Sequence, residues 1–152
     1  MSGINHAGVL VPRYTGKGPQ VPVVYLVDAD SAAITTHCAL TFTDATAGYV
    51  KKVDASGERV IGFAMQDVAS PSADGEASVL VDISTLSLYE MAPDTGTLTY
   101  AELGDSCDIG ADGISINRDA SATDDLQIVS IDVATNTAYV RRLDVGIPGV
   151  VA

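Results

Sequence analysis

Short turn-forming clusters interrupt this chain about every eight to twelve residues, a rhythm that is typical of all-β sandwiches and barrels. The runs between the turns are short, apolar and rich in β-branched residues. None has the helix-length period that would alternate with strands in a βαβ plan. The sequence therefore predicts an all-β fold, a small β-barrel or β-sandwich of short antiparallel strands with an extended N-terminal arm.

Residues 59–91 carry the clearest strand pattern. Two apolar runs, 60–68 and 77–83, flank a linker of small and polar residues with Pro and Gly, and a third strand-like run follows at 85–91. Such a linker is typical of a surface turn. We expect a three-stranded β-meander here, built for packing, because no catalytic pattern lies within it.

Further strands are predicted on both sides of this meander. The clearest is a hairpin of residues 126–133 and 137–143 around a short turn. The two halves of the chain resemble each other only loosely, because each has a turn-rich start followed by a stronger strand pair. No sequence is repeated exactly. Weaker strand signals lie at residues 21–27, 39–43, 49–53, 97–101 and 114–117.

The length of 152 residues fits one domain or two small β modules that share a core. Residues 1–20 are predicted to be an extended arm, because their Gly and Pro content excludes a helix or a central strand. A frayed terminus is the alternative, and deletion of the arm should leave the fold intact but weaken assembly. Residues 21–144 are the predicted β domain, and 145–152 are an apolar C-terminal tail.

Composition restricts both the core and the partners. Apolar residues make up 47% of the chain and aromatic residues only 5%, so the core must consist of Val, Ile, Leu and Ala. The net charge of −12 argues against direct nucleic-acid binding, which needs clustered Lys and Arg. Arg13 and Lys17 are the only charged residues among the first 22, which makes the arm basic on an acidic body.

Targeting and cysteine patterns predict a soluble protein made in a reducing cytoplasm. The first six residues lack the basic and apolar regions of a secretory signal. No apolar run approaches the roughly 20 residues of a membrane helix, so no membrane partner is expected. Cys38 and Cys107 have neither CxxC nor zinc-ligand spacing, which predicts two buried, reduced cysteines.

Several patterns could carry chemistry, but each has an ordinary structural explanation. Residues 105–113 resemble an oxygen-rich calcium loop, yet the EF-hand spacing fails and Asp and Gly are common in turns. The carboxylates at 28–30 and 124–125 would need to converge in a cleft to act as an acid/base pair. A Cys38 nucleophile would need a base placed through space, because His37 has no recognisable flanking motif. We expect no enzyme activity, catalytic residue, metal or cofactor.

Partner binding is predicted at the two ends of the chain. Arg141 and Arg142 are adjacent in a predicted strand, so their side chains point to opposite faces. One can face a partner while the other pairs with the acidic surface, and an ordinary salt-bridged surface pair is the alternative. The predicted partner-binding residues are Val9, Leu10, Val11, Arg13, Tyr14, Lys17, Arg141 and Arg142.

Two longer runs resemble one protein family. VIGFAMQDVASPSADGEASVLVD at 60–82 follows the arm and a strand ending in Asp28. LQIVSIDVATNTAYVRRL at 126–143 contains Asp132 and the paired arginines. Together they resemble, over about residues 21–143, the cement, decoration or head-stabilisation proteins of tailed-bacteriophage capsids.

The resemblance implies a β-barrel or β-sandwich protein that forms homotrimers on the outside of a capsid and binds the major capsid protein. The terminal arm would reach to neighbouring subunits. It also implies a virion location on the capsid exterior, after synthesis in the host cytoplasm, and no active site. The alternative is a carbohydrate-binding or adhesion module of a phage fibre, which would need an exposed aromatic platform from six Tyr and two Phe.

Overall fold

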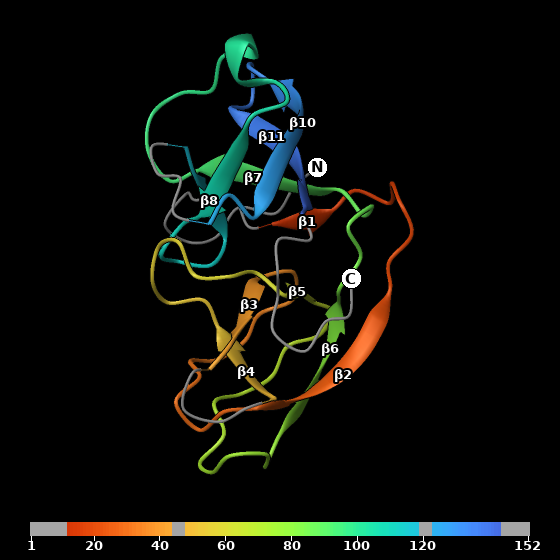
Figure 1. Cartoon of the computed structure of the whole chain (residues 1–152), viewed down its shortest axis with the longest axis vertical. Helices are drawn as coiled ribbons and strands as arrows, with labels where there is room; N and C mark the ends of the chain where they lie inside the picture. Colours follow the sequence, from red (N-terminus) through yellow and green to blue (C-terminus); the bar gives the residue numbers. More distant parts are fainter. Residues whose placement is uncertain (1–11, 44–47, 119–122, 144–152) are drawn as a thin grey trace.

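The computed structural model describes residues 12–43, 48–118 and 123–143, and it confirms the predicted all-β class (Figure 1). Within those ranges the one helical element is a 3-10 turn at Tyr100–Glu102, and no helix there could span a bilayer. The strands are β1 (Arg13–Tyr14), β2 (Pro22–Val27), β3 (Ala39–Phe42), β4 (Tyr49–Lys52), β5 (Gly62–Ala64), β6 (Ser78–Asp82), β7 (Tyr89–Pro93), β8 (Ser106–Ile109), β9 (Ser115–Asn117), β10 (Leu126–Asp132) and β11 (Thr137–Arg142).

Strands β2 to β6 close into a first barrel, in the order β2-β4-β3-β5-β6. All its neighbouring strands are antiparallel except β2 and β4, which run parallel. The barrel is filled by small and branched side chains, as the composition predicted. Its buried core residues are Val27, Ile34, Cys38, Leu40, Val50, Ile61, Ala64, Val79 and Val81.

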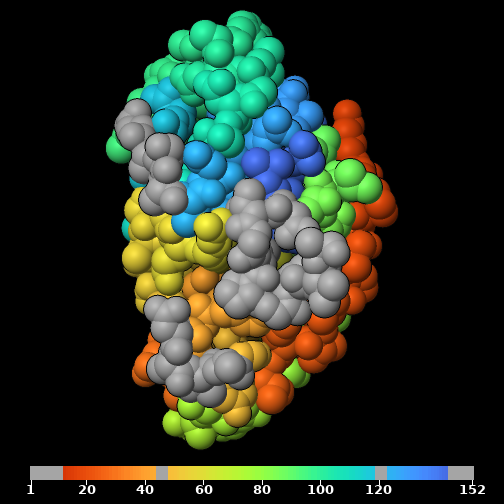
Figure 2. All heavy atoms as spheres, viewed as in Figure 1, coloured from red at the N-terminus to blue at the C-terminus, as the bar shows by residue number. Residues whose placement is uncertain are grey.

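Strands β7 to β11 form a second closed ring. They lie in the order β7-β11-β10-β8-β9, and a parallel pairing of β7 with β9 joins the two ends. Strand β1 adds to the outer edge of β7. The second barrel, green to blue in Figure 1, stacks on the first along the longest axis, and Figure 2 shows both as one continuous body.

The two barrels have the same topology, with β2 to β6 corresponding in order to β7 to β11. In each barrel the first strand runs parallel to the third and antiparallel to the fifth. The second strand pairs with the third and fourth, and the fourth pairs with the fifth, all antiparallel. The chain is therefore a tandem repeat at the level of structure.

The strand registers of the two barrels also agree. Val27 lies opposite Val50 in the first barrel, and Pro93 lies opposite Ile116 in the second. The residue immediately after each first strand is an aspartate, Asp28 or Asp94, whose backbone N–H donates to that partner's carbonyl oxygen, at 2.9 Å in both barrels. This agreement extends the repeat from strand order to individual hydrogen bonds.

The turns that enter the second strand of each barrel match as well. His37 and Gly104 both have positive φ, 73° and 85°. Each donates its backbone N–H to the fourth strand of its own barrel, His37 to Ala64 at 2.7 Å and Gly104 to Ile128 at 2.9 Å. Ala64 and Ile128 are themselves equivalent, because each lies opposite a buried valine of the fifth strand.

The predicted β-meander is wrong in its third strand. Strands β5 and β6 pair antiparallel as predicted, but the chain then leaves the first barrel and β7 pairs with β1, β9 and β11. The predicted strand at 97–101 is also wrong, because 97–99 are irregular and the 3-10 turn follows. The strand signals at 21–27, 39–43, 49–53 and 114–117 and the final hairpin are confirmed.

One hydrophobic cluster crosses from barrel to barrel. Val60 and Phe63 of the first barrel pack in the same buried cluster as Tyr89, Met91 and the apolar residues of the second. The rings of Phe63 and Tyr89 stack with their centroids 4.3 Å apart. The two barrels are therefore joined by a common core.

Candidate docking surfaces

The described part of the predicted arm is a strand on the second barrel. Arg13 and Tyr14 pair antiparallel with Glu90 and Tyr89. The backbone N–H of Thr15 continues this contact by donating to the carbonyl of residue 88 at 3.0 Å. Residues 13–17 thus belong to the folded body, whereas Val9, Leu10 and Val11 lie outside the described residues.

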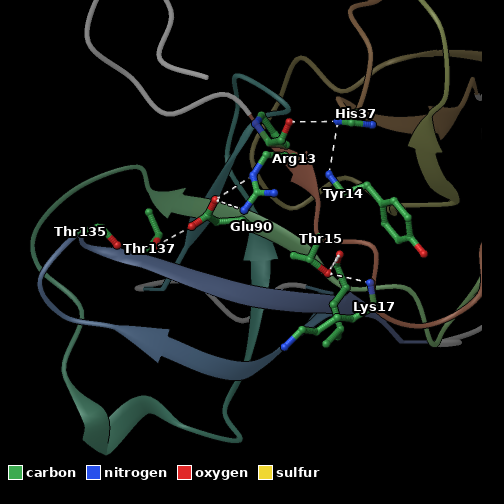
Figure 3. A network of polar contacts seen from close by, with 10 residues as sticks. Arg13, Tyr14, Thr15, Lys17, His37, Glu90, Thr135 and Thr137 are labelled. Carbon is green, nitrogen blue, oxygen red and sulfur yellow. Dashed lines mark hydrogen bonds and ion pairs between the residues drawn. The ribbon is translucent and has the colours of Figure 1, made fainter. Parts of the chain in front are cut away.

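An ion pair holds β1 on β7 (Figure 3). The Nη2 and Nε atoms of Arg13 lie 3.1 and 3.2 Å from Oε1 of Glu90. The second carboxylate oxygen of Glu90 accepts from the Thr137 hydroxyl at 3.2 Å. Because Arg13 remains partly solvated, the pair contributes about 0–1 kcal/mol to stability, and its main effect is to fix the register of β1.

Lys17 lies over the outer face of the second barrel. Its Nζ is 5.7 Å from the ring centroid of Tyr139, and its backbone carbonyl accepts from the N–H of Leu88 at 2.9 Å. A cation over a tyrosine face is attracted by the ring quadrupole, weakly at an exposed site. Arg13 and Lys17, predicted to bind a partner, thus make contacts within their own chain.

Four rings meet where the arm and both barrels come together, and we call them the aromatic junction. Tyr89 is its buried centre, with Phe63 stacked on it. The rings of Tyr14 and His37 each lie 5.5 Å from Tyr89, measured between centroids. Tilted and edge-to-face contacts of this kind are favourable beyond their buried area.

Asp82, the last residue of β6, places a buried carboxylate beside the junction. Oδ2 accepts from the hydroxyls of Ser87 and Tyr89 at 2.7 and 2.8 Å. Oδ1 accepts from the backbone N–H groups of Val21 and Ser84 at 2.9 and 3.0 Å. Burial, together with this adjacent carboxylate, raises the pKa of the Tyr89 hydroxyl above its ordinary value. Four donors make Asp82 a structural group at the crossing between barrels.

His37 contacts the backbone at the base of the arm. Its Nδ1 lies 3.2 Å from the carbonyl oxygen of Pro12 and 3.4 Å from the backbone nitrogen of Tyr14 (Figure 3). Burial lowers the pKa of His37. Burial raises the pKa of the neighbouring Cys38 thiol, which disfavours the thiolate that a nucleophile needs.

Two of the aspartates considered for calcium or acid/base chemistry accept hydrogen bonds from the backbone, and Asp125 also pairs with Arg59 at 3.1 Å. Oδ1 of Asp108 accepts from the N–H of Asp124 at 2.7 Å, and Oδ2 of Asp125 accepts from the N–H of Val60 at 2.6 Å. Burial raises the pKa of Asp125. Within the part of the chain that the structure describes, no group of three His, Cys, Asp or Glu could hold a metal ion.

The paired arginines occupy different environments. Arg142 is only 2% exposed, and its guanidinium donates to the backbone carbonyls of Ile83 and Leu143. Contrary to the prediction, it is not available to a partner, because it bonds to the segment that crosses between barrels. Arg141 bonds to neutral groups, the Gln127 amide oxygen at 2.8 Å and the Thr85 carbonyl at 3.3 Å.

An uncharged apolar surface lies on the outside of the first barrel. Val24 is 63% exposed, and Val21 and Leu26 are each 45% exposed. We call these three residues the β2 apolar face; Figure 2 shows the β2 segment, in orange, along one flank of the molecule. The prediction from sequence missed this face, although its signal is a strand that is apolar at both odd and even positions.

Comparisons of the chain with protein-family models, with curated proteins and with solved structures found no match. Two candidates for docking a partner follow from the sequence and the fold. They are residues 1–11, which precede the described chain at Pro12, and the β2 apolar face. The first contains no Lys, Arg, Asp or Glu and ends in the apolar run 9–11, and the second is also apolar and uncharged.

Proposed function

We propose that this chain is a structural virion protein that binds the outside of a tailed-phage capsid and stabilises the head. In this proposal it acts as a homotrimer on the major capsid protein, without cofactor, nucleic acid or membrane. The observation that supports it most is the fixed base of the N-terminal arm. Strand β1 places that base on the rigid body, next to the aromatic junction.

A fixed base matters because binding by an extended segment costs conformational entropy. Pairing of Arg13 and Tyr14 with β7 already orders this part of the segment, which lowers the entropy cost of binding at a neighbouring surface. Many identical copies on a lattice add avidity, even when each contact is weak. A two-barrel body with one such arm per chain suits a clamp across the boundaries of capsid subunits.

Head binding and assembly state test this proposal together. The full-length chain should elute as a trimer by light scattering and co-sediment with expanded phage heads. A variant that lacks residues 1–11 should lose most head binding and keep the fold. A strict monomer that does not sediment with heads would contradict the proposal.

One surface favours a second function, a carbohydrate-binding module. A shallow groove on the second barrel is lined by Tyr100, Tyr139, Glu90 and Asp132. Tyr100 is 63% exposed and could supply the aromatic platform that a sugar ring needs. A glycan array should then give hits that Tyr100→Ala abolishes, whereas an array without hits would count against this function.

A further inference from the structure

Strand β2 has a backbone edge without a described partner. The bonds from Val27 to Ala77 and from Ile83 to Val21, both 2.9 Å, show that the odd-numbered residues of β2 bond to β6. The N–H and C=O of Val24 therefore point away from β6. On that side β4 pairs only from Leu26 onward, so no described strand pairs with Val24.

The equivalent edge of the second barrel is covered by β1. Val24 corresponds to Glu90, because they lie opposite Leu80 and Tyr139, the equivalent residues of the fifth strands. Glu90 pairs through its backbone with Arg13 of β1. The same fold thus shows, within one molecule, that an extended antiparallel segment fits this edge.

The side chains around the β2 edge select an apolar partner. In the second barrel Glu90 pairs with the charged Arg13, but the equivalent residue on β2 is Val24. No residue of β2 is charged, although the chain as a whole has a net charge of −12. A basic segment would find no counter-ion on this strand, whereas an apolar strand would cover Val24 and Leu26.

The added segment must also be short. Pro22 occupies the position that Leu88 has in the second barrel, where the Leu88 N–H donates to Lys17 of the arm. Proline has no N–H, so that bond cannot form on β2 and pairing centres on Val24. The edge thus accepts a strand of about three residues, by comparison with the strand addition seen at β7.

We propose that residues 9–11, Val-Leu-Val, of a second copy of this chain add to β2 as an antiparallel strand. These residues are uncharged, have high strand propensity, and immediately precede Pro12, where the described chain begins. The acidic body repels other copies, and the β2 apolar face itself adds no charge to that repulsion. Arm and face are different surfaces, so the contact is head-to-tail and can close a ring such as the proposed trimer.

Cysteine cross-linking of the purified chain, without phage heads, tests this inference. Leu10→Cys and Val24→Cys are made as separate variants, one carrying a mass tag, and are mixed and oxidised. The expected product is a covalent dimer with one chain of each kind. Val129→Cys, 42% exposed on β10, is the matched control and should not cross-link to Leu10→Cys. The native Cys38 and Cys107 are buried in the described body and serve as the background control.

Three outcomes would overturn the inference. Dimers of Val24→Cys alone would mean that β2 pairs with itself. A third chain carries both Leu10→Cys and Val24→Cys, and a cross-link that forms only within single molecules of it, with none between the separate variants, would mean that each arm covers its own barrel. No cross-link until capsid protein is added would mean that the capsid supplies the strand. This inference rests on the proposed function. If one of these three results is obtained while head binding persists, only the contact between copies is refuted and the proposed function stands.

A charge variant provides an independent measurement. Val24→Glu should weaken self-association by about tenfold or more, because it places a carboxylate in an apolar contact. Val129→Glu adds the same charge elsewhere on the surface and should change the dissociation constant of self-association little. Equal dissociation constants for the two variants, with both folded by circular dichroism, would contradict the role of the β2 edge.

Discussion

Tyr89 shows how much of this architecture depends on single side chains. Its ring contacts Phe63 of the first barrel and Tyr14 of the arm, while its own backbone belongs to the second barrel. Its hydroxyl donates to the buried carboxylate of Asp82. One residue therefore connects the three parts of the chain, through both apolar packing and a charge-assisted hydrogen bond.

Removing only the hydroxyl isolates the polar part of this connection. Tyr89→Phe should lower the free energy of unfolding by about 1–3 kcal/mol, because a buried carboxylate loses one of its donors. Urea unfolding followed by circular dichroism measures this change. Tyr100→Phe, at an exposed position, should stay within about 0.5 kcal/mol of the parent. Equal midpoints for the two variants would contradict the role assigned to Asp82.

His37 makes stability depend on pH in a defined direction. Burial, opposed by the hydrogen bond to the Pro12 carbonyl and by Asp82 and assisted by the Arg13 charge, lowers its folded-state pKa below 6.5. Between the folded and unfolded pKa values the unfolded chain binds more protons, so the stability from neutral His37 is present above about pH 6.5 and is lost as pH falls. His37→Asn, which tolerates the positive φ, should reduce this slope. Unfolding curves of the parent and of His37→Asn at several pH values from about 5 to 8 measure how the free energy of unfolding depends on pH. Identical pH dependence in the two proteins would contradict the role of His37.

At the scale of elements, β1 changes the boundary of the arm. The sequence predicted that residues 1–20 could be removed without loss of the fold. In the structure β1 supplies strand pairing, the ion pair to Glu90 and the Tyr14 ring at the aromatic junction. We therefore expect the removable arm to end before Pro12.

Two truncations separate docking from folding. A chain that lacks residues 1–11 should keep the parent melting temperature, whereas one that lacks 1–20 should melt several degrees lower, because it exposes Tyr89 and the edge of β7. Differential scanning calorimetry gives both values. A chain without residues 1–20 that melts with the parent would show that β1 adds nothing to the body.

Sequence patterns located most strands but could not assign their neighbours. The final hairpin was predictable because its turn is local, and residues 21–27 were recognisable from their β-branched content. The parallel pairing of β2 with β4, and the crossing after Asp82, depend on contacts between residues far apart in the chain. For the same reason, the burial of Arg142 and the exposure of Val24 were not apparent. The repeat itself was hidden because equivalent residues such as Val24 and Glu90 differ chemically.

At the scale of the molecule, the shared core predicts cooperative unfolding. Phe63 belongs to the first barrel by its strand pairing and to the cluster of the second by its packing. Val79, in contrast, packs in the cluster of the first barrel. Two domains joined only by a linker would unfold independently, but these two barrels cannot separate without exposing the stacked rings of Phe63 and Tyr89.

Phe63→Ala should therefore destabilise both barrels, by about 3–5 kcal/mol in a single transition. Amide hydrogen exchange should speed up in β3 to β6 and in β7 to β11 alike. Val79→Ala is the comparison, since its cavity lies within the first barrel. If Phe63→Ala gave two transitions, or left exchange in the second barrel unchanged, the barrels would be separate folding units.

The position of β1 also limits how this body can be completed. The segment before the first barrel covers the edge of the second barrel, so the first barrel receives no described strand from it. If the first barrel is completed in the same way, the strand that covers β2 comes from another copy, as inferred above. The number of copies in an assembly would then be set by closure, since only a ring in which every chain gives and receives one strand leaves no edge open.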